Sequence, residues 1–179
     1  MSENIVILSG SPRKGGNTDR LVAAFTEGAE SAGKKVTVFR VADMRIGACK
    51  GCNHCFEEKG VCVQKDDMLP ILETIKNATS LVLASPVYYH NVSAQLKTAI
   101  DRMYALIPVG NQLKTSALLM TCGAPHQEPA DPAIAMYKGM CALGKREDAG
   151  IVVAPGLHAP GEIEGREELK QAWTLGQAI

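Results

Sequence analysis

The sequence lacks an excess of either charge. Its 179 residues contain 19 lysine and arginine residues and 19 aspartate and glutamate residues, so the formal net charge is zero. Proteins that bind nucleic acids or anionic membranes usually carry a clear basic excess. We therefore expect the partner to be a small molecule or another protein, and neither a nucleic acid nor a membrane.

The sequence also has no long hydrophobic run near its amino terminus. The apolar segment 5–8 is far shorter than the core of a signal peptide or a membrane span. This predicts a cytoplasmic protein, in which thiols stay reduced. The 6 cysteines are then metal ligands, redox groups or small buried residues rather than a disulfide framework.

Apolar segments of strand and helix type alternate along the chain, without repeats or low-complexity linkers. The length fits one domain over 1–179, with a cysteine-rich insertion at about 42–65. Parallel strands joined by crossover helices predict an α/β fold of three layers, a doubly wound five-stranded parallel sheet. We expect strands at 4–9, 34–41, 80–85, 115–122 and 150–154, and helices at 17–33, 66–75, 96–107, 132–143 and 166–176, the last packing through Trp173.

The turn after the first strand is suited to a phosphate group. Its hydroxyl and amide side chains can donate hydrogen bonds, and its cations can neutralise charge beside the start of a helix. It is not a Walker loop, because Gly15 follows Lys14 where that motif has serine or threonine. It is not a dinucleotide fingerprint either, because Pro12 replaces the second glycine. The alternative is an ordinary polar turn. The candidate residues are Ser9, Ser11, Pro12, Arg13, Lys14, Asn17 and Thr18.

Two further loops follow the third and fourth predicted strands. In such sheets ligands bind beyond the carboxyl ends of the strands, where these loops meet the phosphate loop. A rigid turn with two adjacent tyrosines is suited to a planar ring, and small residues let a ligand approach the backbone. The alternative for the tyrosines is a surface turn. The candidates are Pro86, Val87, Tyr88, Tyr89 and Asn91 in one loop, and Thr121, Cys122 and Gly123 in the other.

Four cysteines lie close together within the insertion, at Cys49, Cys52, Cys55 and Cys62. Thiolates at this spacing suit a [4Fe-4S] cluster or tetrahedral zinc. The spacing differs from that of bacterial ferredoxins, in which the fourth cysteine follows three residues and precedes proline. A cluster, zinc, a redox disulfide and free thiols all remain open.

Three segments together resemble the NADPH-dependent FMN reductase and iron-sulfur flavoprotein family. They are GSPRKGGNT after the first strand, the cysteine-rich segment ending in KDDM, and ASPVYYHNVSAQLKTAIDR. The resemblance covers residues 4 to about 124 and implies a flavodoxin-like sheet of order 2-1-3-4-5. It further implies that the first loop binds the FMN phosphate, that the 86–89 loop lies along the isoalloxazine and that the fourth-strand loop completes the pocket. Dimers or tetramers are expected from the resemblance alone.

The residues and the resemblance together predict an FMN-binding, NAD(P)H-dependent oxidoreductase that passes electrons to a small-molecule or protein acceptor. The flavin would supply the redox chemistry, so no catalytic side chain is assigned. One alternative is an iron-sulfur flavoprotein electron carrier that receives electrons from a ferredoxin through the four cysteines. Another is a non-enzymatic binding module stabilised by zinc.

Overall fold

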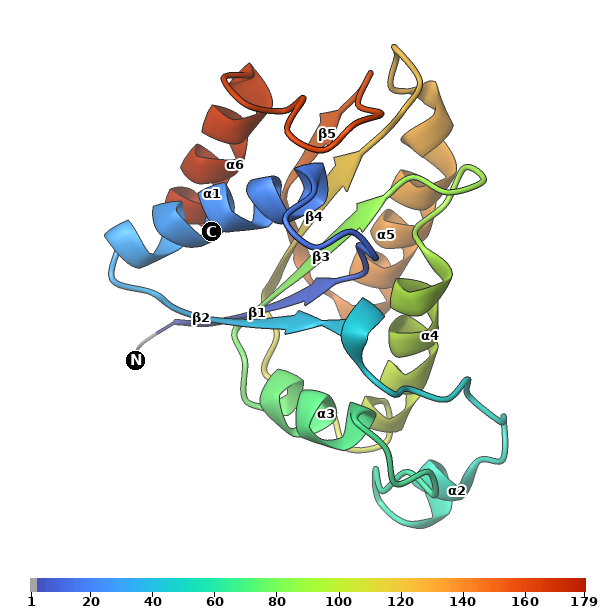
Figure 1. The fold of residues 1–179 in the computed structure, drawn as a ribbon. Coiled ribbons are helices and arrows are strands. Elements are labelled where there is room, and N and C mark those ends of the chain that lie inside the picture. The colour runs from blue at the N-terminus through green and yellow to red at the C-terminus, as the bar shows by residue number, and fades with distance from the viewer. Residues whose placement is uncertain (1–2) are drawn as a thin grey trace.

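The computed structural model describes residues 3–179, which fold around one parallel sheet (Figure 1). The strand order is β2-β1-β3-β4-β5, and every neighbouring pair is parallel. This confirms the predicted class and order. The strands are β1 (Asn4–Ser9), β2 (Lys35–Arg40), β3 (Ser80–Pro86), β4 (Thr115–Thr121) and β5 (Glu147–Ala154).

The long helices agree with the predicted ones, apart from their ends. They are α1 (Asn17–Ser31), α3 (Met68–Lys76), α4 (Ala94–Arg102), α5 (Asp131–Gly144) and α6 (Glu167–Ala178). The stripe expected to continue as α-helix to residue 107 changes to a 3-10 turn, η2 (Met103–Leu106). Short elements that we did not predict are η1 (Val41–Asp43), α2 (His54–Glu57) and η3 (Glu128–Ala130).

Successive strand residues point to opposite faces of the sheet, so each face has its own core. Ile5 and Ile7 pack with α1 and α6, whereas Val6 and Leu8 pack with α3, α4 and α5. Figure 1 shows these two helical layers on either side of the strands. Each fully buried aliphatic side chain contributes about 1.5–3 kcal/mol. The sheet is therefore a rigid support for the loops at its edges.

Glycines allow α1 and α6 to lie unusually close together. A Cβ on Gly28 would overlap the carbonyl oxygen of Trp173, and one on Gly176 would overlap that of Phe25. This contact uses the backbone of Trp173, and its side chain is 36% exposed. Trp173 is therefore partly covered, and neither of the two buried core clusters includes it.

The loops after β1, β3, β4 and β5 all lie at the carboxyl edge of the sheet, because the strands are parallel. That edge is where α/β sheets bind ligands. The cysteine-rich segment instead protrudes beside α3 (Figure 1). None of the helices among the described residues has the length and apolar character needed to cross a bilayer.

Candidate flavin site and cysteine loop

A cavity of about 200 Å³ opens at the carboxyl edge of the sheet. Its walls come from four loops that are far apart in the sequence. It has a polar end next to the start of α1 and a more apolar end at the exit of β3. The lining residues are Ser11, Arg13, Asn17, Thr18, Pro86, Val87, Tyr88, Thr121, Gly123, Leu157 and His158.

The start of α1 forms the polar end. Gly16, the residue before the helix, supplies no side-chain cap, so amide groups of the first turn lack that partner. The Gly15 amide is already used, since it donates to Asp19 Oδ2 at 2.8 Å. A helix amino terminus with an arginine beside it attracts an anion. Arg13 supplies that cation and, in this structure, donates from Nη1 to the carbonyl oxygen of His158 at 2.7 Å.

Thr18 and Thr121 join the first loop to the end of β4. Their hydroxyl oxygens lie 2.8 Å apart, and both residues are buried. One of the two hydroxyls donates to the other, so the donor keeps a free acceptor position and the acceptor keeps a free proton. The pair fixes the distance between two walls of the cavity.

The Asn17 side chain holds the loop that follows β5. Its amide nitrogen donates to the Ala159 carbonyl oxygen at 2.8 Å, and its oxygen accepts from the amides of Gly161 at 3.0 Å and Ile163 at 3.4 Å. We predicted that Asn17 donates to a phosphate. In the structure one of the two Nδ2 protons is donated to a backbone carbonyl, so Asn17 positions the cavity wall. The second proton has no acceptor among the described residues, and Asn17 lines the cavity, so its contact with a phosphate stays a prediction.

The β3 exit is a tight turn. Tyr88 and Asn91 exchange backbone hydrogen bonds of 2.8 and 3.0 Å across Tyr89 and His90, which have φ values of 46° and 62°. Positive φ at both central positions is typical of a type I′ turn and costs non-glycine residues roughly 1–3 kcal/mol each. The Val87 amide donates to the Thr121 carbonyl oxygen at 2.7 Å, which joins this turn to β4. The backbone is thereby held in a strained but defined shape.

Ser93 fastens the phosphate loop to the start of α4. Its hydroxyl donates to the Gly10 carbonyl oxygen at 2.7 Å and accepts from the Leu96 amide at 3.3 Å, and its own amide donates to Ser85 Oγ at 2.8 Å. A Cβ at Gly10 would lie 2.5 Å from both Leu96 Cβ and Ser93 Oγ. Only glycine therefore fits where the loop leaves β1.

Six of the predicted binding residues do not line the cavity. Ser9 and Cys122 are buried beneath it, and Ser9 Oγ has no hydrogen-bond partner among the described residues. The exposed Lys14 faces Asp43 at 3.5 Å, and Asn91 Oδ1 accepts from the Val92 amide. The last two, Pro12 and the completely exposed Tyr89, lie on the outer surface of their loops.

Sequence analysis missed Leu157 and His158, which form the fourth wall. The His158 and Ala159 amides both donate to Glu162 Oε2, at 2.6 and 3.0 Å, and these bonds lower the pKa of the Glu162 carboxyl. The His158 ring lies against Gly123, where a Cβ would be 3.2 Å from the ring. The pair Pro155-Gly156 directly after β5 is typical of a loop. No motif in the sequence connects this loop to Arg13, which lies 145 positions before His158.

The four cysteines lie around one small depression on the protruding loop. Cys49 and Cys52 are exposed, and Cys55 and Cys62 are half-buried. Burial raises the pKa of the Cys55 thiol, and the three neighbouring cysteines raise it further. Among residues 3–179, however, no three cysteine, histidine, aspartate or glutamate side chains are placed to hold one metal ion. The sulfur donors suit a metal, but their present arrangement does not form a site.

Arg102 and Asp66 fasten the two ends of this loop. The buried Arg102 donates from Nη1 to Asp66 at 2.7 Å and to the Gly47 carbonyl oxygen at 2.8 Å, and from Nη2 to Cys62 Sγ at 3.3 Å. Asp66 also accepts from the Gly47 and Met68 amides. Burial alone would raise the pKa of Asp66, but these hydrogen bonds outweigh it and lower that pKa. Sequence analysis assigned Arg102 no role.

The groups that line the cavity at the sheet edge suit the two ends of flavin mononucleotide. One end offers helix amides, hydroxyls and Arg13 to a phosphate, and the other offers Pro86, Val87 and Tyr88 to a flat ring. Gly123 has no side chain to obstruct the space between them.

Comparisons with known proteins identify the family of the chain. Residues 4–134 match the family model for NADPH-dependent FMN reductase. An iron-sulfur flavoprotein of Archaeoglobus fulgidus is 37% identical over 172 residues, which cover 95% of this chain and 76% of that protein. An iron-sulfur flavoprotein of Methanocaldococcus jannaschii is 41% identical over 110 residues, which cover 62% of this chain and 56% of that protein.

A solved structure shows the same fold. The NAD(P)H:quinone oxidoreductase from Methanothermobacter marburgensis superimposes with a TM-score of 0.73 at 21% identity, covering 99% of this chain and 96% of that one. At this identity the similarity concerns the arrangement of strands and helices.

Proposed function

The chain belongs to the NADPH-dependent FMN reductase family and is an FMN-dependent oxidoreductase, and from this premise we propose that it accepts hydride from NAD(P)H. The single observation that carries the proposal is the cavity at the carboxyl edge, with an anion-binding end and an apolar end. Bound FMN supplies the redox chemistry, since it can exchange one or two electrons. The protein residues bind it, orient it and limit access to it.

We assign separate tasks to the cavity residues. Arg13 and the amides at the start of α1 bind the phosphate, assisted by Ser11 and Thr18. Pro86, Val87 and Tyr88 contact the ring, and Gly123 allows its close approach. The walls contain no carboxylate, so a phosphate meets no repulsion there. Tyr89 is fully exposed and is free to contact an electron donor or acceptor.

The test is an anaerobic absorbance spectrum of the purified chain, recorded before and after addition of NADPH or NADH. We expect flavin bands that bleach with a nicotinamide donor. Arg13→Gln should weaken FMN retention by about tenfold or more, because a charge-assisted contact is lost. The matched control is Arg20→Gln, which removes an exposed arginine of α1 whose one ion pair among residues 3–179 is with Glu164. A chain that binds no added FMN, or bound flavin that neither donor reduces, would contradict the proposal.

A second function is favoured by the four cysteines around one depression and by the iron-sulfur flavoproteins among the relatives. We propose as this alternative an electron carrier that takes electrons from a ferredoxin through a [4Fe-4S] cluster. The cysteine loop would have to rearrange, since its described shape does not bring three ligands together. Stoichiometric iron and sulfide with slow NAD(P)H oxidation would favour the carrier. Zinc alone, or no metal, would exclude it.

We also propose one domain over 1–179, with 42–65 as its insertion, acting in the cytoplasm as a homodimer or homotetramer. The shared sheet and core support the single domain. The family resemblance supports the oligomer. Sedimentation of the flavin-loaded chain would measure the assembly directly, and a monomer at all concentrations would contradict it.

A further inference from the structure

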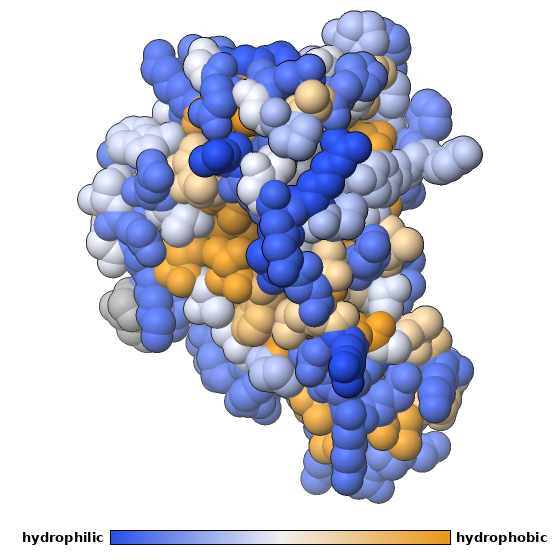
Figure 2. Space-filling model, viewed as in Figure 1, coloured by the Kyte–Doolittle hydropathy of each residue, from blue (hydrophilic) through white to orange (hydrophobic). Residues whose placement is uncertain are grey.

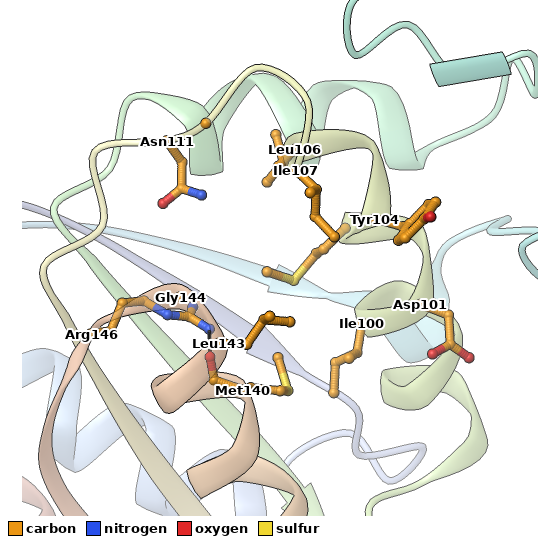
Figure 3. A pocket seen from close by; sticks show the side chains of 12 residues that line it. Ile100, Asp101, Tyr104, Leu106, Ile107, Asn111, Met140, Leu143, Gly144 and Arg146 are labelled. Carbon is orange, nitrogen blue, oxygen red and sulfur yellow. Dashed lines mark hydrogen bonds between the residues drawn. The ribbon is translucent and has the colours of Figure 1, made fainter. Parts of the chain in front are cut away.

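A second and larger cavity lies at the opposite edge of the sheet. Its volume is about 400 Å³, within the range of small-molecule sites, and it separates the ends of α4 and η2 from the end of α5 (Figure 3). In Figure 3, Ile100 and Tyr104 lie on one side, and Met140, Leu143 and Arg146 lie on the other. Asn111, shortly before β4 begins at Thr115, lies at the rim.

The walls are mostly apolar and partly open to solvent. Ile107 is 51% exposed and Leu143 is 78% exposed, although both are large aliphatic residues. Exposed apolar surface around a hollow indicates a binding site. Six side chains make up the apolar wall: Ile100, Met103, Leu106, Ile107, Met140 and Leu143. The cysteine loop also exposes hydrophobic residues (Figure 2). These residues, Phe56, Val61 and Val63, do not line this cavity.

Arg146 is the one cation that lines this cavity. Its Nη2 donates to the Met140 carbonyl oxygen at 2.9 Å, whereas its Nε is buried and has no partner among residues 3–179. Burial lowers the pKa of Arg146, and no carboxylate of the described chain lies within salt-bridge distance of it. A partly desolvated guanidinium without a counter-ion is costly.

Nearby acids are already engaged. Asp101 lines the cavity but pairs with Lys97 at 2.6 Å, and Asp148 accepts the hydroxyl of Tyr137 at 2.7 Å. Gly144 provides the space that the guanidinium occupies, because a Cβ there would lie 2.6 Å from Arg146 Nε. The arginine is therefore held at the cavity wall with its charge uncompensated.

We propose that this cavity binds a small molecule with an apolar body and one anionic group, such as a carboxylate, which pairs with Arg146. The apolar walls match the body. The buried Nε is out of reach, so the anion would pair through Nη1, which donates to no group of the described chain. The site is separate from the flavin site, because the two lie at opposite ends of β4. The seven residues of β4 span about 20 Å. Hydride transfer requires the donor and acceptor atoms to approach to roughly 3–3.5 Å. The ligand is therefore an effector or cargo and not the hydride acceptor.

Calorimetric titration of the flavin-loaded chain tests the proposal. The probes are decanoate, decan-1-ol and decyltrimethylammonium, which share an apolar chain and differ in charge, each below its micelle concentration. We expect decanoate to bind best. Arg146→Gln should weaken decanoate binding by about tenfold or more and leave decanol nearly unchanged. Lys138→Gln, which removes an exposed cation of α5 outside the cavity, is the matched control.

A second variant does not depend on Arg146. Leu143→Glu places an anion on an exposed part of the wall, so it should fold normally and abolish decanoate binding, whereas Leu143→Lys should retain it. Equal binding of the three probes, or unchanged decanoate affinity in Arg146→Gln, would overturn the proposal. So would failure of decanoate to bind at all. Flavin absorbance monitors the other site independently throughout.

Discussion

Replacing Asn17 with alanine should loosen the wall after β5, because the side chain holds that loop. The substitution deletes three hydrogen bonds, to the Ala159 carbonyl and to the amides of Gly161 and Ile163. Net values near 1 kcal/mol per bond, reduced for the long third bond, give a loss of about 2 kcal/mol. If the loop must close around the flavin, the FMN affinity falls by up to about 30-fold.

Comparing FMN with riboflavin, which lacks the phosphate, separates positioning from phosphate binding. Fluorescence titration of the apoprotein should show Asn17→Ala weakening both flavins by the same factor. Arg13→Gln serves as the contrasting variant and should weaken FMN much more than riboflavin, because it removes a cation from the phosphate end. If Asn17→Ala weakens FMN alone and leaves riboflavin affinity and thermal stability unchanged, the positioning role is refuted.

Two further predictions concern pH and helix packing. The pKa of Glu162 is lowered in the folded chain, so the carboxylate stabilises the loop after β5 at pH values above its unfolded pKa of roughly 4.3. This stabilisation is lost as the pH falls through the folded pKa. FMN release between about pH 5 and 3 should therefore shift in Glu162→Gln, and an identical release profile would contradict this. Gly28→Ala should cost roughly 1–3 kcal/mol or more, because its Cβ overlaps the Trp173 carbonyl oxygen, and an unchanged melting temperature would show that the helices separate freely.

The centre of the sheet was predictable because β1, β3 and β4 are buried on both faces. Runs such as Ile5–Leu8 are continuously apolar, and the crossover rule then leaves few possible topologies. The position of the loop after β1 at the cavity was predictable for a related reason, because a polar loop that follows a buried parallel strand lies at the carboxyl edge of the sheet. Both predictions use only local sequence and general geometry.

The remaining features depend on contacts between distant residues. Nothing local distinguishes Tyr88 from Tyr89, yet the turn places the first in the cavity wall and exposes the second completely. His158 becomes part of the site through Arg13, which is 145 positions away. Arg102 looks like an exposed charge at the end of a helix, but only 2% of its surface is accessible. Each of these properties requires three-dimensional coordinates.

The cysteine loop is fastened at its ends rather than along its length. Asp66 and Arg102 hold Gly47 and the Cys62 end, whereas Cys49 and Cys52 are exposed. These anchors are hydrogen bonds within the protein itself, and Arg102 contacts one of the four thiols, Cys62, directly. Thus the same chain joins a cavity at the carboxyl edge of the sheet to a thiol loop whose two ends are held by one ion pair, Arg102 with Asp66.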